Sequence, residues 1–202
     1  MKTSYEKRMQ AGSGCGLWVD RQAFVLRKEG QTVVKSRNLT LAGVLIAAGV
    51  VCSPFYIPLG IAKCFPVQHL VNVMAGILLG PFYAVCMAFC TSFIRVMLGT
   101  GSLLAFPGSM AGALLCGILY KYTTKTALAF MGEVVGTGII GSVIAAGLAV
   151  AFLSSQVAVL GFVVPFGISS LVGAALALVL IRILKKTGVI QYFKAEEKQN
   201  AI

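Results

Sequence analysis

The sequence predicts an all-α integral membrane protein, a bundle of six transmembrane helices, and two observations carry this prediction. Hydrophobic residues make up 58% of the 202 residues and charged residues only 11%, whereas about a quarter of the residues in a soluble domain are charged. The stretch 39–181 holds only five of the charged residues. Six spanning helices of about 20 residues each fit into this stretch with short loops between them.

Breaks in the apolar stretch place the six helices in order. Glycine, proline and clustered polar residues interrupt helices. In order the breaks are Pro54–Pro66, Gly80-Pro81, Gly99–Ser102, Lys121–Thr126 and Ser154–Gln156. The helices between them are predicted near 39–53, 66–80, 81–98, 103–120, 127–153 and 161–182.

The distribution of lysine and arginine predicts the topology. The N-terminal tail holds eight of the 17 basic residues, the C-terminal tail holds five, and Lys121 and Lys125 lie in one short loop. Basic residues accumulate on the cytoplasmic side of membrane proteins. Both termini are therefore predicted in the cytoplasm, which requires an even number of helices and agrees with six. The exceptions are Lys63 and Arg95.

Three regions are expected along the chain. Residues 1–36 form a polar cytoplasmic extension, 37–187 the six-helix membrane domain, and 188–202 a cytoplasmic tail. The extension lacks the apolar core of a signal peptide. It is either a disordered tail or the product of a misassigned start. The purine-rich codons available for Arg27–Gly30 resemble a ribosome-binding site, and Val33 or Val34 follows at a suitable distance.

Several function classes lack their motifs. The sequence contains no GxxxxGK[ST], HExxH, CxxC or GxSxG, and its only aspartate is Asp20, in the extension. The net charge of +11 lies mainly on the tails, so it is a topology signal rather than a nucleic-acid-binding one. Cys86 and Cys90 share a helix face, but packing explains them better than a metal. We expect no enzyme, no catalytic residue, no metal, no cofactor and no nucleic-acid partner.

Polar side chains at the start of the second predicted helix form the first candidate binding wall. Gln68 and Asn72 are four residues apart and His69 and Asn72 three, so these side chains share a face. They are suited to binding a small polar heterocycle through hydrogen bonds, beneath a lid formed by the preceding proline-rich segment. The alternative is helix capping and interhelical hydrogen bonding.

The third predicted helix ends in a second candidate group. Arg95 either snorkels to the outer interface or faces inward and orients the turn that contains Thr100. Two glycines in that turn allow its backbone to approach a ligand closely. Phe106 follows and either stacks on a flat ring or packs against lipid and core.

Glu133 is the only acid between Glu29 and Glu196. It is predicted roughly 9 Å from the inner end of its helix, whereas Arg95 is roughly 21 Å from its own. A direct ion pair between Arg95 and Glu133 is therefore not expected. Glu133 is either a hydrogen-bond acceptor for a ligand or a structural partner for a buried hydroxyl or amide.

Three separated motifs resemble the ThiW family. They are Phe65–His69 through Gly76–Pro81, Gly99–Gly101 through Phe106–Ser109, and Gly132-Glu133 through Gly136–Gly138. The resemblance covers about residues 35–190. It implies the substrate-binding S component of an energy-coupling-factor importer that captures the thiazole moiety of thiamin, hydroxyethylthiazole, or a close precursor.

The resemblance also implies partners and a location. They are a transmembrane coupling subunit and two ABC ATPases in the plasma membrane of a prokaryote. The coupling subunit would contact small residues of the first helix, here Ala42, Gly43 and Ala47. The expected mechanism closes the loop 54–66 over a cavity, and the partners then drive release. This cavity would be lined by His69, Asn72, Arg95, Phe106 and Glu133.

Three rival functions remain open from the sequence. A self-sufficient secondary transporter needs a titratable relay, for which Glu133 and His69 are the only candidates. A membrane-embedded enzyme needs clustered Asp, His or Cys residues, which the chain lacks. A purely structural membrane subunit needs no ligand site, and composition alone does not separate it from the other two.

Overall fold

The computed structural model describes residues 36–59, 62–153, 160–188 and 190–191. Two compact units divide the chain, Asn38–Ile190 and a second unit of residues 1–37 with 191–202. Almost all of the second unit lies outside the described residues, as do the predicted start near Val33 and the C-terminal tail beyond Gln191. The fold described below is that of Asn38–Ile190 and of the helix that leads into it.

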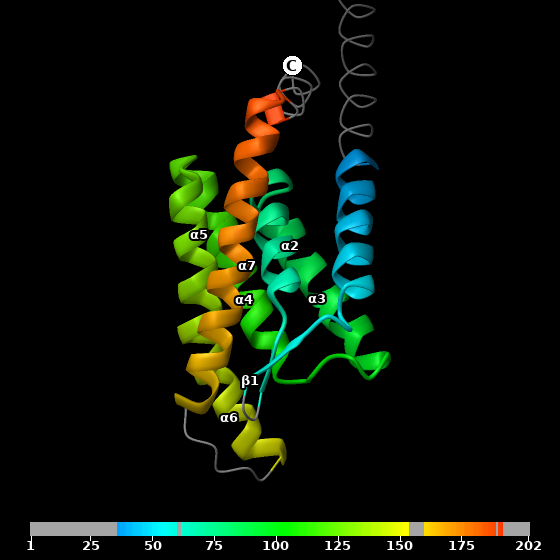
Figure 1. The fold of residues 1–202 in the computed structure, drawn as a ribbon, viewed down its shortest axis with the longest axis vertical. Helices are drawn as coiled ribbons and strands as arrows, with labels where there is room; N and C mark the ends of the chain where they lie inside the picture. The colour runs from blue at the N-terminus through cyan, green and yellow to red at the C-terminus, as the bar shows by residue number, and fades with distance from the viewer. Residues whose placement is uncertain (1–35, 60–61, 154–159, 189, 192–202) are drawn as a thin grey trace, which may run out of the picture. The chain divides into compact units, whose positions relative to one another are not determined.

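The described residues are predominantly helical, as the sequence predicts (Figure 1). A helix over Ser36–Val51 precedes a small hairpin and a series of further helices. These are α2 (Pro66–Leu78), α3 (Pro81–Met97), α4 (Ala105–Thr123), α5 (Thr126–Val135), the π-helix η1 (Gly136–Gly141), α6 (Ser142–Leu153) and α7 (Leu160–Lys186).

Proline and glycine set the helix boundaries near the predicted positions. Pro66 and Pro81 begin α2 and α3, where the missing N–H of proline costs no helical hydrogen bond. Gly80 separates these helices with φ of 84°, a left-handed conformation that favours glycine. The sharp reversal between α2 and α3 therefore depends on the Gly80-Pro81 pair.

The segment Pro54–Pro66, expected to be a loop, contains a two-stranded antiparallel hairpin. Strand β1 (Ile57–Leu59) pairs with β2 (Ala62–Cys64), and Ile57 lies opposite Cys64. The hairpin packs against α7. Its end is tied to α7 because the Cys64 thiol donates to the Pro165 carbonyl at 3.2 Å.

The fifth predicted helix is continuous in sequence but changes its winding. A π-helical turn, η1, joins α5 to α6. Such turns insert an extra residue into an α-helix, and they are frequently found at functional sites. Together these elements form an apolar helix over Thr126–Ala151. This helix and the helix Gly161–Lys186 are each long and apolar enough to cross a membrane. Shorter apolar helices cover Ser36–Val51, Pro66–Leu78 and Pro81–Met97.

Helix α4 packs against α2, α3, α5, η1 and α6, and glycines permit these close approaches. A Cβ atom added to Gly132 would lie 2.8 Å from the Cys116 backbone nitrogen. One added to Gly76 would lie 3.1 Å from the Gly117 nitrogen. Small residues let helix backbones approach closely in lipid, and here they bring α2 and α5 onto the same stretch of α4 near Cys116.

The first helix presents two different faces. Ala42 is buried, and Gly49 faces the core so closely that an added Cβ would lie 2.8 Å from Thr91 Cγ2. Gly43 and Ala47 are exposed on the other face. Ala42 therefore lies inside this chain rather than on the face predicted for partner contact, because it packs with the helix's inward stripe.

Candidate functional site

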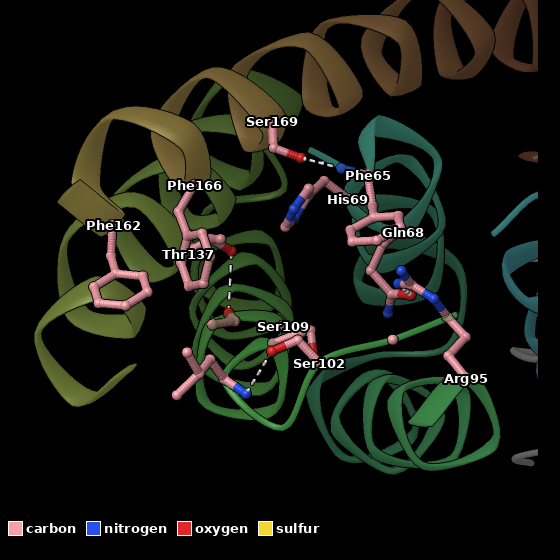
Figure 2. Close-up of a pocket in the computed structure, with 14 residues that line it drawn as sticks. Phe65, Gln68, His69, Arg95, Ser102, Ser109, Thr137, Phe162, Phe166 and Ser169 are labelled. Atoms are coloured by element: carbon pink, nitrogen blue, oxygen red, sulfur yellow. Dashed lines mark hydrogen bonds between the residues drawn. The ribbon is translucent and has the colours of Figure 1, made fainter. Parts of the chain in front are cut away.

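A cavity of about 240 Å³ lies between α2, α3, α4, η1 and α7 (Figure 2). It is smaller than the roughly 300–1,000 Å³ of sites for drug-sized ligands. Its walls are mostly apolar. The lining residues are Phe65, Gln68, His69, Arg95, Gly101, Ser102, Leu104, Ala105, Gly108, Ser109, Thr137, Phe162, Phe166 and Ser169.

Helix α7 supplies an aromatic wall. Phe162, Phe166 and Ser169 recur at the spacing of one helix face, and the two rings contact each other edge to face at 6.0 Å. The Ser169 hydroxyl accepts a hydrogen bond of 2.8 Å from the Phe65 backbone N–H. This bond fixes the entry to α2, and with it Phe65, across the cavity from Phe166 (Figure 2).

Helix α2 supplies the polar wall. Gln68 and His69 line the cavity, and both are buried. Asn72, one turn further, is fully buried behind them, where its amide donates to Glu133 Oε1 at 3.0 Å and to the Ser109 carbonyl at 3.2 Å. Asn72 therefore connects α2 to α4 and α5 and does not line the cavity itself.

Glu133 accepts hydrogen bonds from three side chains, two on α2 and one on η1, with a single oxygen. Its Oε1 atom lies 2.9 Å from His69 Nδ1, 3.0 Å from Asn72 Nδ2 and 3.3 Å from Thr137 Oγ1. When Nδ1 donates to the carboxylate, the other ring nitrogen of His69 is left for the cavity. Glu133 itself has no exposed surface, so it orients His69 from behind.

The π-helical turn brings Thr137 to the cavity. The Thr137 hydroxyl lies 3.1 Å from the Gly108 carbonyl, and a Cβ added to Gly141 would collide with the Gly108 Cα. The start of α4 and η1 thus cross through a contact between glycines. Beside them, Ser109 Oγ lies 2.9 Å from Ser92 Oγ of α3, which adds a hydroxyl group to this wall.

Arg95 points inward rather than snorkelling. The side chain is 1% exposed, its Nη1 atom donates to Gln68 Oε1 at 2.9 Å, and its guanidinium carbon lies 3.8 Å from the centre of the Phe65 ring. Among the described residues the ion pair of Glu133 is with His69, not with Arg95, which agrees with the predicted difference in depth.

Besides Asn72 and Glu133, two more predicted site residues, Thr100 and Phe106, lie outside the cavity lining. The Thr100 hydroxyl contacts Ser53 Oγ at 2.9 Å and the Arg95 carbonyl at 3.2 Å, so it joins the turn after α3 to the turn that follows the first helix. Phe106 packs edge to face on Phe89 at 5.6 Å, away from the ligand space. Phe106 therefore has the packing role that the sequence left as its alternative.

Sequence reasoning missed the aromatic lining of the cavity. In the sequence Phe65 belongs to a motif, and no polar neighbour singles out Phe162 or Phe166. The available signal was their placement around Pro165, since a proline inside a membrane helix marks a place where the helix is locally irregular. Phenylalanine is otherwise unremarkable in an apolar helix.

The arrangement is suited to binding rather than to covalent chemistry. Aromatic rings at both ends, a few fixed polar groups and a small volume suit a flat, compact ligand. Within the described part of the chain no three His, Cys, Asp or Glu side chains gather to hold a metal ion.

A comparison with protein-family models decides the family. The model described as thiamine-precursor transporter protein (ThiW) matches residues 39–187. The chain belongs to the ThiW family. This match confirms the resemblance seen in the sequence motifs, and it assigns the apolar helices to a membrane transport protein. No curated protein and no solved structure gives a significant match.

The family match covers the part of the chain that forms the cavity. The matched region includes every residue that lines the cavity. A thiamine-precursor transporter has to bind its precursor, and residues from five helical elements line this cavity.

Proposed function

We propose that this ThiW protein is the substrate-binding subunit of an energy-coupling-factor importer, and that it captures the thiazole moiety of thiamin or a close precursor. The observation that carries the proposal is the cavity of about 240 Å³ inside a chain of a thiamine-precursor transporter family. The absence of a nucleotide-binding motif from the sequence supports a division of labour in which partner ATPases supply the energy.

A thiazole ring fits the character of the walls. The ring is flat and partly apolar, so it suits the space between Phe65 and Phe166, where aromatic faces favour offset or edge contacts. His69 presents its free ring nitrogen toward a heteroatom of the ligand, and Gln68 and Ser109 offer further polar contacts. Asn72 and Glu133 act on the ligand through His69.

The proposed topology follows the charge distribution. Six helices cross the plasma membrane of a prokaryote, and both termini are cytoplasmic. The hairpin Ile57–Cys64 then lies at the outer side and closes over the cavity. The exposed face of the first helix, which includes Gly43 and Ala47, packs on the coupling subunit, and two ABC ATPases drive reorientation and release.

The buried acid argues against a self-sufficient secondary transporter. Glu133 is the only Asp or Glu among the described residues, and its one hydrogen-bonded oxygen is already shared by His69, Asn72 and Thr137. A proton relay across the membrane requires a chain of titratable groups. This network instead has the properties of a fixed support for the binding wall.

Replacing Phe166 with alanine tests the aromatic wall. Removing a buried phenylalanine contact forfeits about 1.5–3 kcal/mol, so the affinity of purified protein for radiolabelled hydroxyethylthiazole is expected to fall roughly 10- to 100-fold. Phe82→Ala is the matched control, because Phe82 is 75% exposed on α3 and lies outside the cavity lining. Equal affinity in the two variants would remove α7 from the site.

A further inference from the structure

We propose that the ligand of this cavity carries a compact oxyanion, a carboxylate or a phosphate monoester, which the guanidinium of Arg95 binds along one edge. This inference rests on the proposed function, since it specifies the substrate class of the same site. The ligand is then an acidic derivative of the thiazole rather than the neutral alcohol.

The hydrogen-bonding of Arg95 is incomplete on one edge. Its Nη1 atom donates to Gln68, whereas Nε and Nη2 are buried and have no hydrogen-bond partner among the residues that the structure describes. In a guanidinium group Nε–H and one Nη2–H point in the same direction, and this edge matches two oxygens of a carboxylate or phosphate. The unpaired atoms are therefore the pair that binds an oxyanion in bidentate fashion.

The charge of Arg95 is also unmatched within the described part of the chain. Glu133 is the only acidic residue there, and its paired oxygen is engaged by His69 and Asn72. The charged groups around the cavity are thus the Arg95 guanidinium, whose hydrogen-bond partner is the neutral amide of Gln68, and the Glu133 carboxylate, which is already paired with His69. Because buried charges require a counter-charge or strong hydrogen bonds, an anionic ligand completes the site.

Two helix starts add positive potential to the same space. Phe65 and Leu104 are the N-cap residues of α2 and α4, both line the cavity, and neither caps its helix with a side-chain hydrogen bond. The N-terminus of a helix carries a partial positive charge that stabilises anions. Both helix dipoles therefore act in the same direction as Arg95.

The contact with Phe65 is compatible with this role. The central carbon of the Arg95 guanidinium lies over the Phe65 ring, 3.8 Å from the ring centre, and Figure 2 shows both side chains at the cavity. A ring face attracts a cation but accepts hydrogen bonds only weakly, so it leaves the N–H groups in the guanidinium plane unsatisfied. Phe65 holds the group in position, and an oxyanion in that plane adds to the ring contact without replacing it.

The test compares three radiolabelled ligands on the full-length protein in lipid nanodiscs: hydroxyethylthiazole, its phosphate monoester, and the same thiazole bearing a ring carboxylate. We expect at least one anionic form to bind tenfold or more tightly than the neutral alcohol. Arg95→Gln is expected to remove this preference, so that neither anionic form binds more tightly than the alcohol. Arg95→Lys keeps the positive charge but loses the paired donors of the guanidinium, so its preference for the anionic ligand is expected to lie between those of the wild type and Arg95→Gln.

The control variant is Arg182→Gln, which makes the same change at an exposed position on α7, and monodispersity on size exclusion shows that each variant is folded. The phosphate and carboxylate arms identify which oxyanion the site takes. Binding of the alcohol as tightly as both anions overturns this inference and leaves the proposed function standing. Binding of none of the three ligands by the wild-type protein overturns the proposed function, and this inference with it.

Discussion

Glu133→Ala is expected to lower the stability of the protein by about 3–5 kcal/mol, the range seen when one partner of a buried charged pair is removed. The Glu133 Oε1 atom holds His69, Asn72 and Thr137 at 2.9, 3.0 and 3.3 Å. Without it, His69 Nδ1 loses this acceptor, and Asn72 and Thr137 keep only their bonds to the Ser109 and Gly108 carbonyls. Thermal unfolding of the purified protein in detergent is expected to begin roughly 10 °C lower.

Glu133→Gln provides the conservative comparison. Glutamine keeps one carbonyl acceptor for His69 and Asn72, but it places an amide where Glu133 Oε2 now has no hydrogen-bond partner in the described part of the chain. Its unfolding midpoint should therefore lie between those of the wild type and Glu133→Ala. If Glu133→Ala unfolds within a degree of the wild type, the carboxylate is not the connection between α2, α5 and η1 described above.

Gly136→Val is expected to destabilise the fold by about 3 kcal/mol, the upper part of the usual range for overpacking. A Cβ at position 136 would lie 2.7 Å from the Ala111 carbonyl oxygen and 2.7 Å from the Gly112 Cα. Both neighbours are backbone atoms of α4, so the clash is relieved only when the helices separate. Because η1 carries Thr137 into the cavity, affinity for the ligand should fall with stability.

Gly147→Val is the matched control for Gly136→Val. Gly147 lies in α6, and nothing approaches within 4 Å of a Cβ added there. This variant should retain wild-type stability within about 1 kcal/mol, since only helix propensity changes. Equal loss of stability in the two variants would show that the substitution acts through local helix propensity and not through the contact between η1 and α4.

The positions of the helices were largely predictable because the length of an apolar stretch, and the glycine and proline residues that interrupt it, are local features of the sequence. Gly80-Pro81 marks a helix boundary wherever it lies in space. The hairpin was not predictable, since β1 and β2 have three residues each and Pro58 lies within β1, where proline argues against a strand. The π-helical turn was missed because Gly136–Gly141 preserves the apolar character of its helix.

The candidate site was predictable where a polar residue stands out from an apolar background. Gln68, His69 and Arg95 were found in this way, and the structure brings all three to the cavity. The aromatic wall was not, because its placement depends on a contact between Phe65 and Ser169, 104 positions apart. Spacing along one helix gives no information about contacts of that kind.

The most direct test of the account measures labelled thiazole in sealed vesicles that contain this ThiW protein alone, with the best-binding form of the ligand. The account predicts saturable binding of at most one ligand per protein, which stays the same when a proton or sodium gradient is imposed. Accumulation beyond that ratio in response to a gradient would show that the chain transports by itself. That result, or the absence of saturable binding, would contradict a capture subunit that depends on its partners for energy.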